Sequence, residues 1–298
     1  MPKRIGLISI LVICGLLSTP RDVYAQALIP HTLQLDVTKL EQQGLSLAQE
    51  AAQLAQFQQY EIALPRARLA SQLAPKNDKV WLLLGGLYLQ TKNLDNAITA
   101  LKQAQSLNPK NGDIHFALGS AHFQQQKYSE AIGYFQTGLN LKPNDPEGLF
   151  DLGNAYYMVG KKPEALVQYK KAVSFNKKFW PAINNVGLIL YEQGDLQGAM
   201  KQWQQAIPIA KALKQPESEP LLALAVAMYT RGNQQQALAM GEAALRIDER
   251  YGDLDFLKQN LWGERLLSDT KKFLSLPRIQ AALGQRENSS QPRRTRTQ

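Results

Sequence analysis

Two ladders of small residues run along the chain with the same period. In each ladder consecutive members are 34 residues apart, and the second lies twelve residues after the first: Ala51, Gly85, Gly119, Gly153, Gly187, and Ala63, Ala97, Ala131, Ala165, Ala199. Between the ladders, apolar residues fall at helical spacing, as in Trp81, Leu84, Gly85 and Tyr88. Each period therefore predicts two amphipathic helices.

Helix-breaking residues lie where this pattern needs turns. Gly160-Lys161-Lys162-Pro163 and Gly194-Asp195 separate the two helices of a period, and Pro109 and Pro143 close two periods. One helical pair cannot bury both of its apolar faces, whereas stacked pairs form a continuous core. The pattern therefore predicts an all-α fold, an α-solenoid of stacked antiparallel helix pairs.

The unit resembles the tetratricopeptide repeat, whose consensus has an aromatic residue, Leu-Gly, Tyr, Ala, an aromatic, Ala and Pro in order. One copy fills it almost completely, with Trp81, Leu84-Gly85, Tyr88, Ala97, Leu101, Ala104 and Pro109. In the next copy His115 and His122 replace Trp81 and Tyr88, and we interpret them as core aromatics rather than metal ligands. The sixth copy follows after 38 residues instead of 34, which indicates four inserted residues around Gln215-Pro216-Glu217-Ser218.

The resemblance covers residues 44–250 as six repeats. A repeat array needs a terminal element to cover its last apolar face, and we assign residues 251–283 as capping helices. Their apolar residues are Leu254, Leu257, Leu261, Trp262, Leu266 and Phe273. Residues 26–43 are a leader, and residues 284–298 are predicted to be a disordered basic tail with Arg293, Arg294 and Arg296.

Residues 1–25 have the pattern of a secretory signal peptide. Lys3 and Arg4 precede an apolar run from Ile5 to Leu17, and Val23-Tyr24-Ala25 is a small-residue cleavage site, with Ala27 as the alternative. An uncleaved anchor is the other interpretation, although the run is shorter than the roughly 20 residues that span a bilayer. We expect an exported protein, periplasmic or lumenal and in one alternative membrane-associated.

The signal segment contains Cys14, the only cysteine, so its removal leaves no disulfide or thiolate site. Ile13 stands where a lipoprotein signal needs a small residue. Removal also lowers the formal net charge from +9 to +7, because Lys3, Arg4 and Arg21 leave together with Asp22. The remaining excess favours anionic partners.

Six lysines cluster in one copy and form a candidate basic edge: Lys161, Lys162, Lys170, Lys171, Lys177 and Lys178. Such a run is either a solvated face or a surface for an acidic protein or an anionic membrane. Export makes nucleic acid an unexpected partner.

The resemblance implies that the first helix of each pair lines a concave face. On the family's inward slots, together with Asn185, the candidate partner-binding residues are Leu82, Leu89, Phe116, Phe123, Phe150, Asn154, Tyr157, Asn184, Asn185, Tyr191 and Tyr229. Large apolar residues along a groove indicate a binding surface for an amphipathic helix or an extended segment, although each one alone is also compatible with core packing. Asn154 and Asn185 are expected to hold a ligand's backbone. Leu82, Phe116 and Phe150 occupy slots where the family's carboxylate clamp needs lysine.

The sequence contains no phosphate-binding loop, metal-binding histidine pair or nucleophile elbow. We therefore expect no catalytic residues, no metal, no cofactor and no small-molecule substrate. The leading hypothesis is a protein–protein interaction scaffold, an adaptor or complex-assembly factor in the cell envelope. The alternatives are a membrane-surface or envelope-structural protein that uses the basic edge and tail, and a non-catalytic regulatory subunit of an enzyme.

Overall fold

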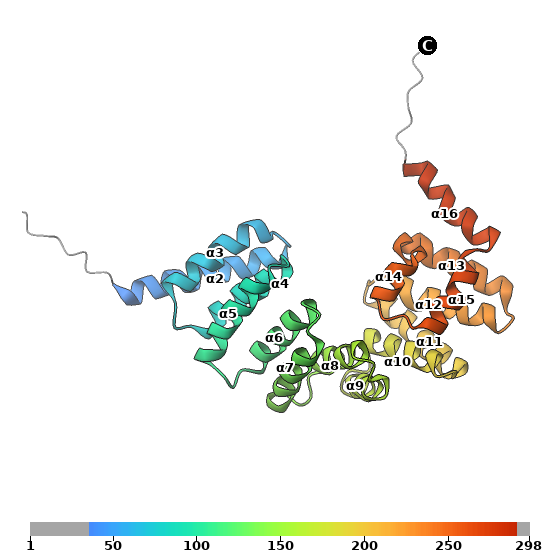
Figure 1. Ribbon diagram of the computed structural model, residues 1–298. Helices are drawn as coiled ribbons and strands as arrows, with labels where there is room; N and C mark the ends of the chain where they lie inside the picture. The colour runs from blue at the N-terminus through green and yellow to red at the C-terminus, as the bar shows by residue number, and fades with distance from the viewer. Residues whose placement is uncertain (1–35, 291–298) are drawn as a thin grey trace, which may run out of the picture. The chain divides into compact units, whose positions relative to one another are not determined.

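The computed structural model describes residues 36–290, with side chains through residue 283, and every regular element in that range is a helix (Figure 1). Twelve of these helices form six consecutive pairs: α2 (Val37–Gln56) and α3 (Tyr60–Leu73), α4 (Asp78–Gln90) and α5 (Leu94–Leu107), α6 (Gly112–Gln124) and α7 (Tyr128–Leu141), α8 (Pro146–Met158) and α9 (Lys162–Phe175), α10 (Trp180–Glu192) and α11 (Leu196–Ala212), α12 (Ser218–Thr230) and α13 (Gln234–Ile247). They are followed by the short 3-10 helix η1 (Glu249–Gly252), α14 (Leu254–Gln259), α15 (Glu264–Leu274) and α16 (Pro277–Ser290).

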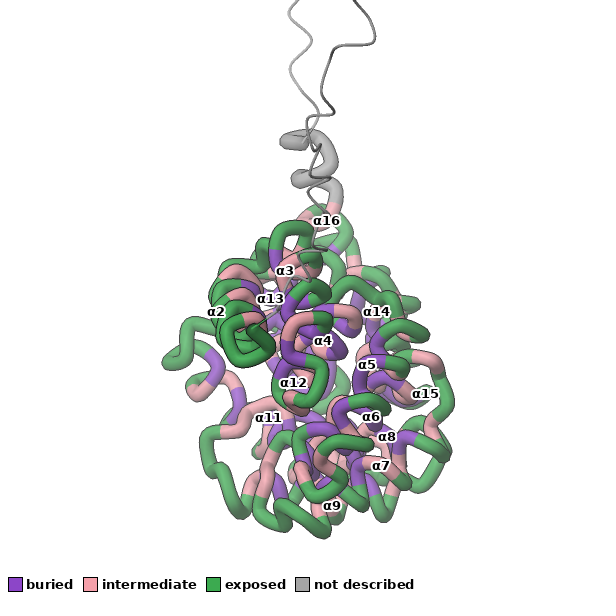
Figure 2. Tube along the Cα trace, turned by 90° about the vertical axis from the view of Figure 1, so that its left-hand side faces the viewer, coloured by how far each residue is buried: buried purple, intermediate pink, exposed green. Residues whose placement is uncertain are grey.

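From α3 to α13 successive helices contact one another, and α2 packs against α3 through Gly44, which confirms the predicted solenoid. Buried and exposed positions alternate along the helices (Figure 2). The signal peptide and residues 26–35 of the leader lie outside the described residues, and residues 37–43 of the leader belong to α2. Two predicted boundaries shift, because α2 begins at Val37 and α16 extends to Ser290, into the range predicted to be disordered. Residues 291–298, with the three tail arginines, also lie outside the described part.

The small-residue ladder lets one large side chain from the second helix of a pair reach the backbone of the first. A Cβ atom added at Gly85, Gly119, Gly153 or Gly187 would lie 2.5–2.6 Å from an atom of the residue sixteen positions later. Those residues are Leu101, Phe135, Tyr169 and Trp203, and all four are at most 1% exposed. The glycines are therefore packing positions, and the large partners form the core between the helices.

The turn between the two helices of each pair has one residue with a positive φ. In the first three pairs this residue is Gln58, Lys92 or Gln126, and in the next three it is Gly160, Gly194 or Gly232. Only glycine adopts this left-handed conformation without steric cost. The last three turns, which have glycine there, are therefore less strained than the first three.

Repeated side-chain contacts also fix the starts of the first helices. Asn77, Asn111 and Asp145, spaced by 34 residues, each accept a hydrogen bond from a backbone amide of the helix that they precede. His115 takes the place of Trp81 and keeps its hydrogen bond, because its Nε2 lies 2.8 Å from the Pro109 carbonyl oxygen, as Trp81 Nε1 lies 2.9 Å from that of Pro75. The interpretation of His115 as a core aromatic agrees with this contact.

The last pair is closed by a residue from far along the chain. At the position of the large core residue, α13 has Gly241, and the Phe273 ring of α15 lies against it, 0% exposed. Helix α15 also contacts α10 and α12, so the capping segment covers these first helices as well as the end of the array. Within residues 36–290, no helix is both long enough and apolar enough to cross a membrane.

Candidate partner-binding cavity

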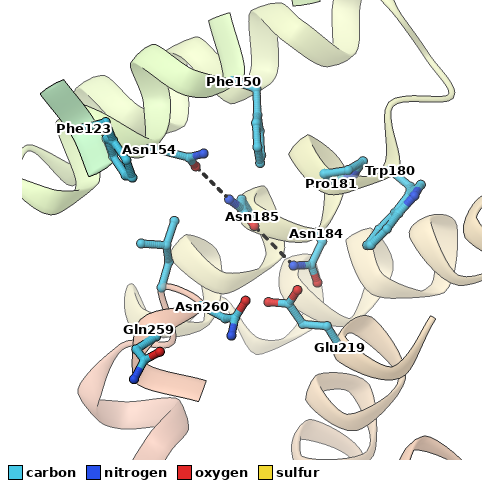
Figure 3. A pocket seen from close by; sticks show the side chains of 11 residues that line it. Phe123, Phe150, Asn154, Trp180, Pro181, Asn184, Asn185, Glu219, Gln259 and Asn260 are labelled. Carbon is cyan, nitrogen blue, oxygen red and sulfur yellow. Dashed lines mark hydrogen bonds between the residues drawn. The ribbon is translucent and has the colours of Figure 1, made fainter. Parts of the chain in front are cut away.

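A cavity of about 220 Å³ opens where the first helices α6, α8, α10 and α12 meet the end of α14 (Figure 3). Its wall combines aromatic rings, amide side chains and one carboxylate: Phe123, Phe150, Asn154, Trp180, Pro181, Asn184, Asn185, Glu219, Gln259, Asn260 and Leu261. Phe150 and Asn154 are one helical turn apart on α8, so both side chains lie on the same face of that helix. The helix pairing thus brings residues that are distant in sequence to one site.

A directed chain of hydrogen bonds orients the amides. Tyr169 Oη donates to Asn154 Oδ1 at 2.8 Å, Asn185 Nδ2 donates to the same oxygen at 3.2 Å, and Asn184 Nδ2 donates to Asn185 Oδ1 at 3.2 Å. Asn184 is 1% exposed, and its amide oxygen is buried without a hydrogen-bond partner. An unsatisfied buried acceptor costs free energy, so this oxygen is available to a donor that enters the cavity.

Glu219, in the first turn of α12, contributes the only carboxylate of this lining. Burial raises the pKa of Glu219 to about 7, although hydrogen bonds from Trp262, Asn184 and Tyr251 act in the opposite direction. Trp262 Nε1 donates to Glu219 Oε1 at 3.1 Å. These donors are all neutral, so no positive charge compensates the ionised form.

A second cavity, of about 190 Å³, shares Phe123 and Asn154 with the first. It adds Ser120, Gln124, Phe135 and Asp151 to the lining. Burial, together with the nearby charges of Glu147 and Asp145, raises the pKa of Asp151 to about 7. The two adjoining cavities therefore form one recess, which has a carboxyl group in each part.

The recess contains five of the eleven predicted groove residues, namely Phe123, Phe150, Asn154, Asn184 and Asn185. Asn185 Nδ2 hydrogen-bonds to Asn154 Oδ1, so the two amides expected to hold a ligand's backbone contact each other. The Phe150 ring packs against Tyr169 and Phe179, with ring centroids 5.6 and 5.4 Å apart. It is held rigidly on the cavity wall.

The prediction of an open groove over the last two copies was wrong, because α15 covers it. Tyr191 is 1% exposed, and its hydroxyl donates to Asp269 Oδ2 at 2.9 Å, while Tyr229 packs edge-on against Phe273. The Glu192 carboxylate accepts hydrogen bonds from the backbone amides of Arg265 and Leu266 and so caps the start of α15. These residues hold the chain's own capping helix.

The other predicted groove residues also serve packing. Phe116 fills the space above Gly138 and Gly148, where an added Cβ would lie 2.5 Å from its ring. Leu82 and Leu89 belong to the core around Ala97 and Leu101. Tyr157 is half-buried against the α8–α9 core and lies under the Lys162 ammonium group, 5.6 Å from the ring centroid. For these four positions, core packing is the better interpretation.

The six lysines of the basic edge lie on α9 and the turns that flank it, and all but Lys162 are exposed. Among the described residues none of them forms an ion pair. Nor does the described part of the chain contain a cluster of three or more side chains suited to a metal ion.

Sequence reasoning missed several residues that line the recess, among them Trp180, Glu219 and Asn260, and also missed Phe179, whose ring packs against Phe150. One signal was the break in the capping ladder, because Phe179 stands where the earlier copies have Asn77, Asn111 and Asp145. Another was the four-residue insertion, whose Gln215 accepts a hydrogen bond from the Trp180 indole. Asn260 carried no such signal, since it reaches the site through the folding-back of α14.

Comparison with known proteins identifies the repeat. A family profile described as "TPR repeat" matches residues 85–126 and 119–160, and a second, "Tetratricopeptide repeat", matches residues 182–213. Among curated proteins, none matches the sequence.

Solved structures share the fold at low identity. One, titled "Functional Characterization of Pseudomonas Aeruginosa pilF", superposes with a TM-score of 0.63 at 15% identity, covering 74% of this chain and 98% of that one. The structure of PilW, described as a widely conserved type IV pilus biogenesis factor, gives 0.60 at 21% identity, covering 76% and 97%. The Cut9–Hcn1 structure gives 0.61 at 18% identity, covering 76% and 46%. Profile matches, 34-residue period and helix pairing agree, and the chain contains tetratricopeptide repeats.

Proposed function

We propose that this protein is an interaction scaffold that holds a segment of a partner protein in the recess formed by Phe123, Phe150, Asn154, Asn184, Glu219 and Asp151. The observation that carries the proposal is the combination of a rigid aromatic wall with a buried, unsatisfied amide oxygen. Aromatic anchors supply binding free energy, and an oriented amide fixes the register of a peptide backbone. Repeat proteins of this family act through such recognition surfaces.

The finer role is that of an adaptor or complex-assembly factor in the cell envelope. The N-terminal signal pattern supports export. Two proteins of similar structure are pilF and PilW, and PilW is described as a type IV pilus biogenesis factor. α15 occupies the last two copies, so the partner segment is confined to the recess and the copies before it.

The test is a cross-linking pull-down from cell envelope with the mature protein and two phenylalanine variants. Phe150→Ala removes a ring from the recess, whereas Phe175→Ala removes a ring that is 50% exposed at the end of α9. If Phe150 anchors the partner, its loss weakens binding by roughly 1.5–3 kcal/mol, or about ten- to a hundred-fold, while Phe175→Ala binds normally. Circular dichroism must show intact helix in both.

Persistence of the same partners with Phe150→Ala would contradict the recess assignment. If those partners were then released by salt or by neutral substitutions in the basic edge, the membrane-surface or acidic-partner alternative would replace it.

A further inference from the structure

We propose that the recess selects a partner segment by a cationic side chain, an arginine in preference to a lysine, that hydrogen-bonds to both Glu219 and the buried amide oxygen of Asn184. This inference rests on the proposed function and specifies the chemistry of the bound segment.

An unpaired acceptor is present at this end of the cavity. The chain from Tyr169 through Asn154 and Asn185 uses the Asn184 amide nitrogen and leaves its oxygen unpaired. Asn260 Nδ2 donates to the Phe256 carbonyl oxygen at 2.7 Å, and the Asn260 side chain also lines the cavity. Figure 3 shows Asn184, Glu219 and Asn260 gathered at one end of the cavity. A ligand that carries only donors best satisfies the Asn184 amide oxygen and the Glu219 carboxylate. Guanidinium presents five N–H groups and no acceptor.

Charge favours the same ligand. Within residues 36–283 neither Glu219 nor Asp151 forms an ion pair with a lysine or arginine. The first helices α4, α6, α8, α10 and α12 carry six carboxylates and a single lysine: Asp78, Asp113, Glu147, Asp151, Glu192, Glu219, and Lys79. The first helices thus carry more carboxylates than cations, and two of these carboxylates, Glu219 and Asp151, line the recess.

The walls of the cavity suit the flat face and the alkyl stem of arginine. Phe150 and Trp180 both line it, and the Trp180 indole is held in place by its hydrogen bond to Gln215. A guanidinium group stacks on aromatic rings while its edge bonds to a carboxylate, an arrangement that an ammonium group matches less well.

A displayed random-peptide library selected on the full mature protein tests this directly. Peptides that bind in the recess are those that no longer bind the Phe150→Ala variant. We expect these peptides to be enriched in arginine at one position. Replacing that arginine by citrulline, which has the same shape without the charge, should weaken binding about ten- to a hundred-fold, and Glu219→Gln should do the same. Glu249→Gln, which removes an exposed carboxylate from η1, is the matched control and should bind normally.

Nuclear magnetic resonance of the tryptophan indole groups locates the bound residue. On adding the selected peptide, the indole signals of Trp180 and Trp262 should shift, because Trp180 lines the cavity and Trp262 donates to Glu219, while that of Trp81 in α4 should not. Glu219→Gln keeps an acceptor for Trp262. If the folded variant loses its preference for arginine, the negative charge of Glu219 is therefore what selects the arginine.

Two outcomes would overturn the inference. If the selected peptides require Phe150 but show no preference for a cationic side chain, the proposed function stands and the inference of an arginine fails. Arginine peptides that bind only after deletion of residues 291–298 would assign the cavity to the chain's own basic tail instead of a partner. If no peptide depended on Phe150, the proposed function itself would fail.

Discussion

Replacing Glu219 by glutamine removes a buried negative charge and preserves the shape of the side chain. The amide oxygen of glutamine can still accept the hydrogen bond that Trp262 Nε1 makes to Glu219 at 3.1 Å. The substitution therefore isolates the cost of holding an ionised carboxylate on the wall of the recess. We expect it to stabilise the protein at neutral and alkaline pH.

The magnitude follows from the pKa of Glu219, which burial raises from 4.5 to about 7. Each unit corresponds to 1.36 kcal/mol, so the shift is worth about 3 kcal/mol. For a group whose pKa is raised on folding, the stability contribution is present below the unfolded pKa and is lost as the pH rises through the folded pKa. The advantage of Glu219→Gln should therefore be small near pH 4, grow between about pH 4.5 and 7, and level off above about pH 7.

Urea unfolding followed by circular dichroism, repeated across this pH range, measures the difference in the free energy of unfolding. Comparing the two proteins at each pH cancels the titration of other groups, including Asp151. The comparison requires equal slopes against urea, because stacked repeats can unfold in parts. An advantage that does not change with pH, or a loss of stability at about pH 8, would refute the reasoning that Glu219 is held in an unfavourable charged state.

Three further substitutions test the packing. Gly153→Leu places a Cβ 2.5 Å from the Tyr169 ring and should cost about 1–3 kcal/mol or more in urea unfolding; unchanged stability would disprove the close helix approach. Phe273→Ala empties a core position that is 0% exposed and should cost about 3–5 kcal/mol, with faster hydrogen exchange in α15; unaltered exchange would show that α15 is held by other contacts. Lys92→Gly relieves a φ of 57° and should raise the melting temperature through about 1 kcal/mol of added stability, whereas a fall would mean that the lysine side chain outweighs the backbone cost.

The repeat architecture could be predicted from the sequence because its signals are local. A period of 34 residues, small residues at fixed offsets and breakers between them follow from the pairing of neighbouring helices. The exchange of Trp81 for His115 keeps a flat ring with a hydrogen bond to the proline carbonyl oxygen six residues earlier. Asn154 and Asn185 lie beside each other because their helices belong to consecutive pairs.

The groove was predicted only in part. The position of a residue within its repeat does not indicate whether another segment of the chain packs over it. Tyr191 and Tyr229 occupy the same kind of slot as Tyr157, but α15 returns from some 40 to 80 residues later in the chain and packs over them. Gly241, at the register position of Trp203, was a sequence sign of a missing core side chain, but it could not reveal that Phe273 supplies it. The sequence by itself determined the helix pairs and their order, since these depend on contacts between neighbours. Tertiary structure decided which part of the first-helix face remains open. It also brought Glu219 and Asn260 together with Asn184 there, because burial of the last apolar face returns the C-terminal helices to the array.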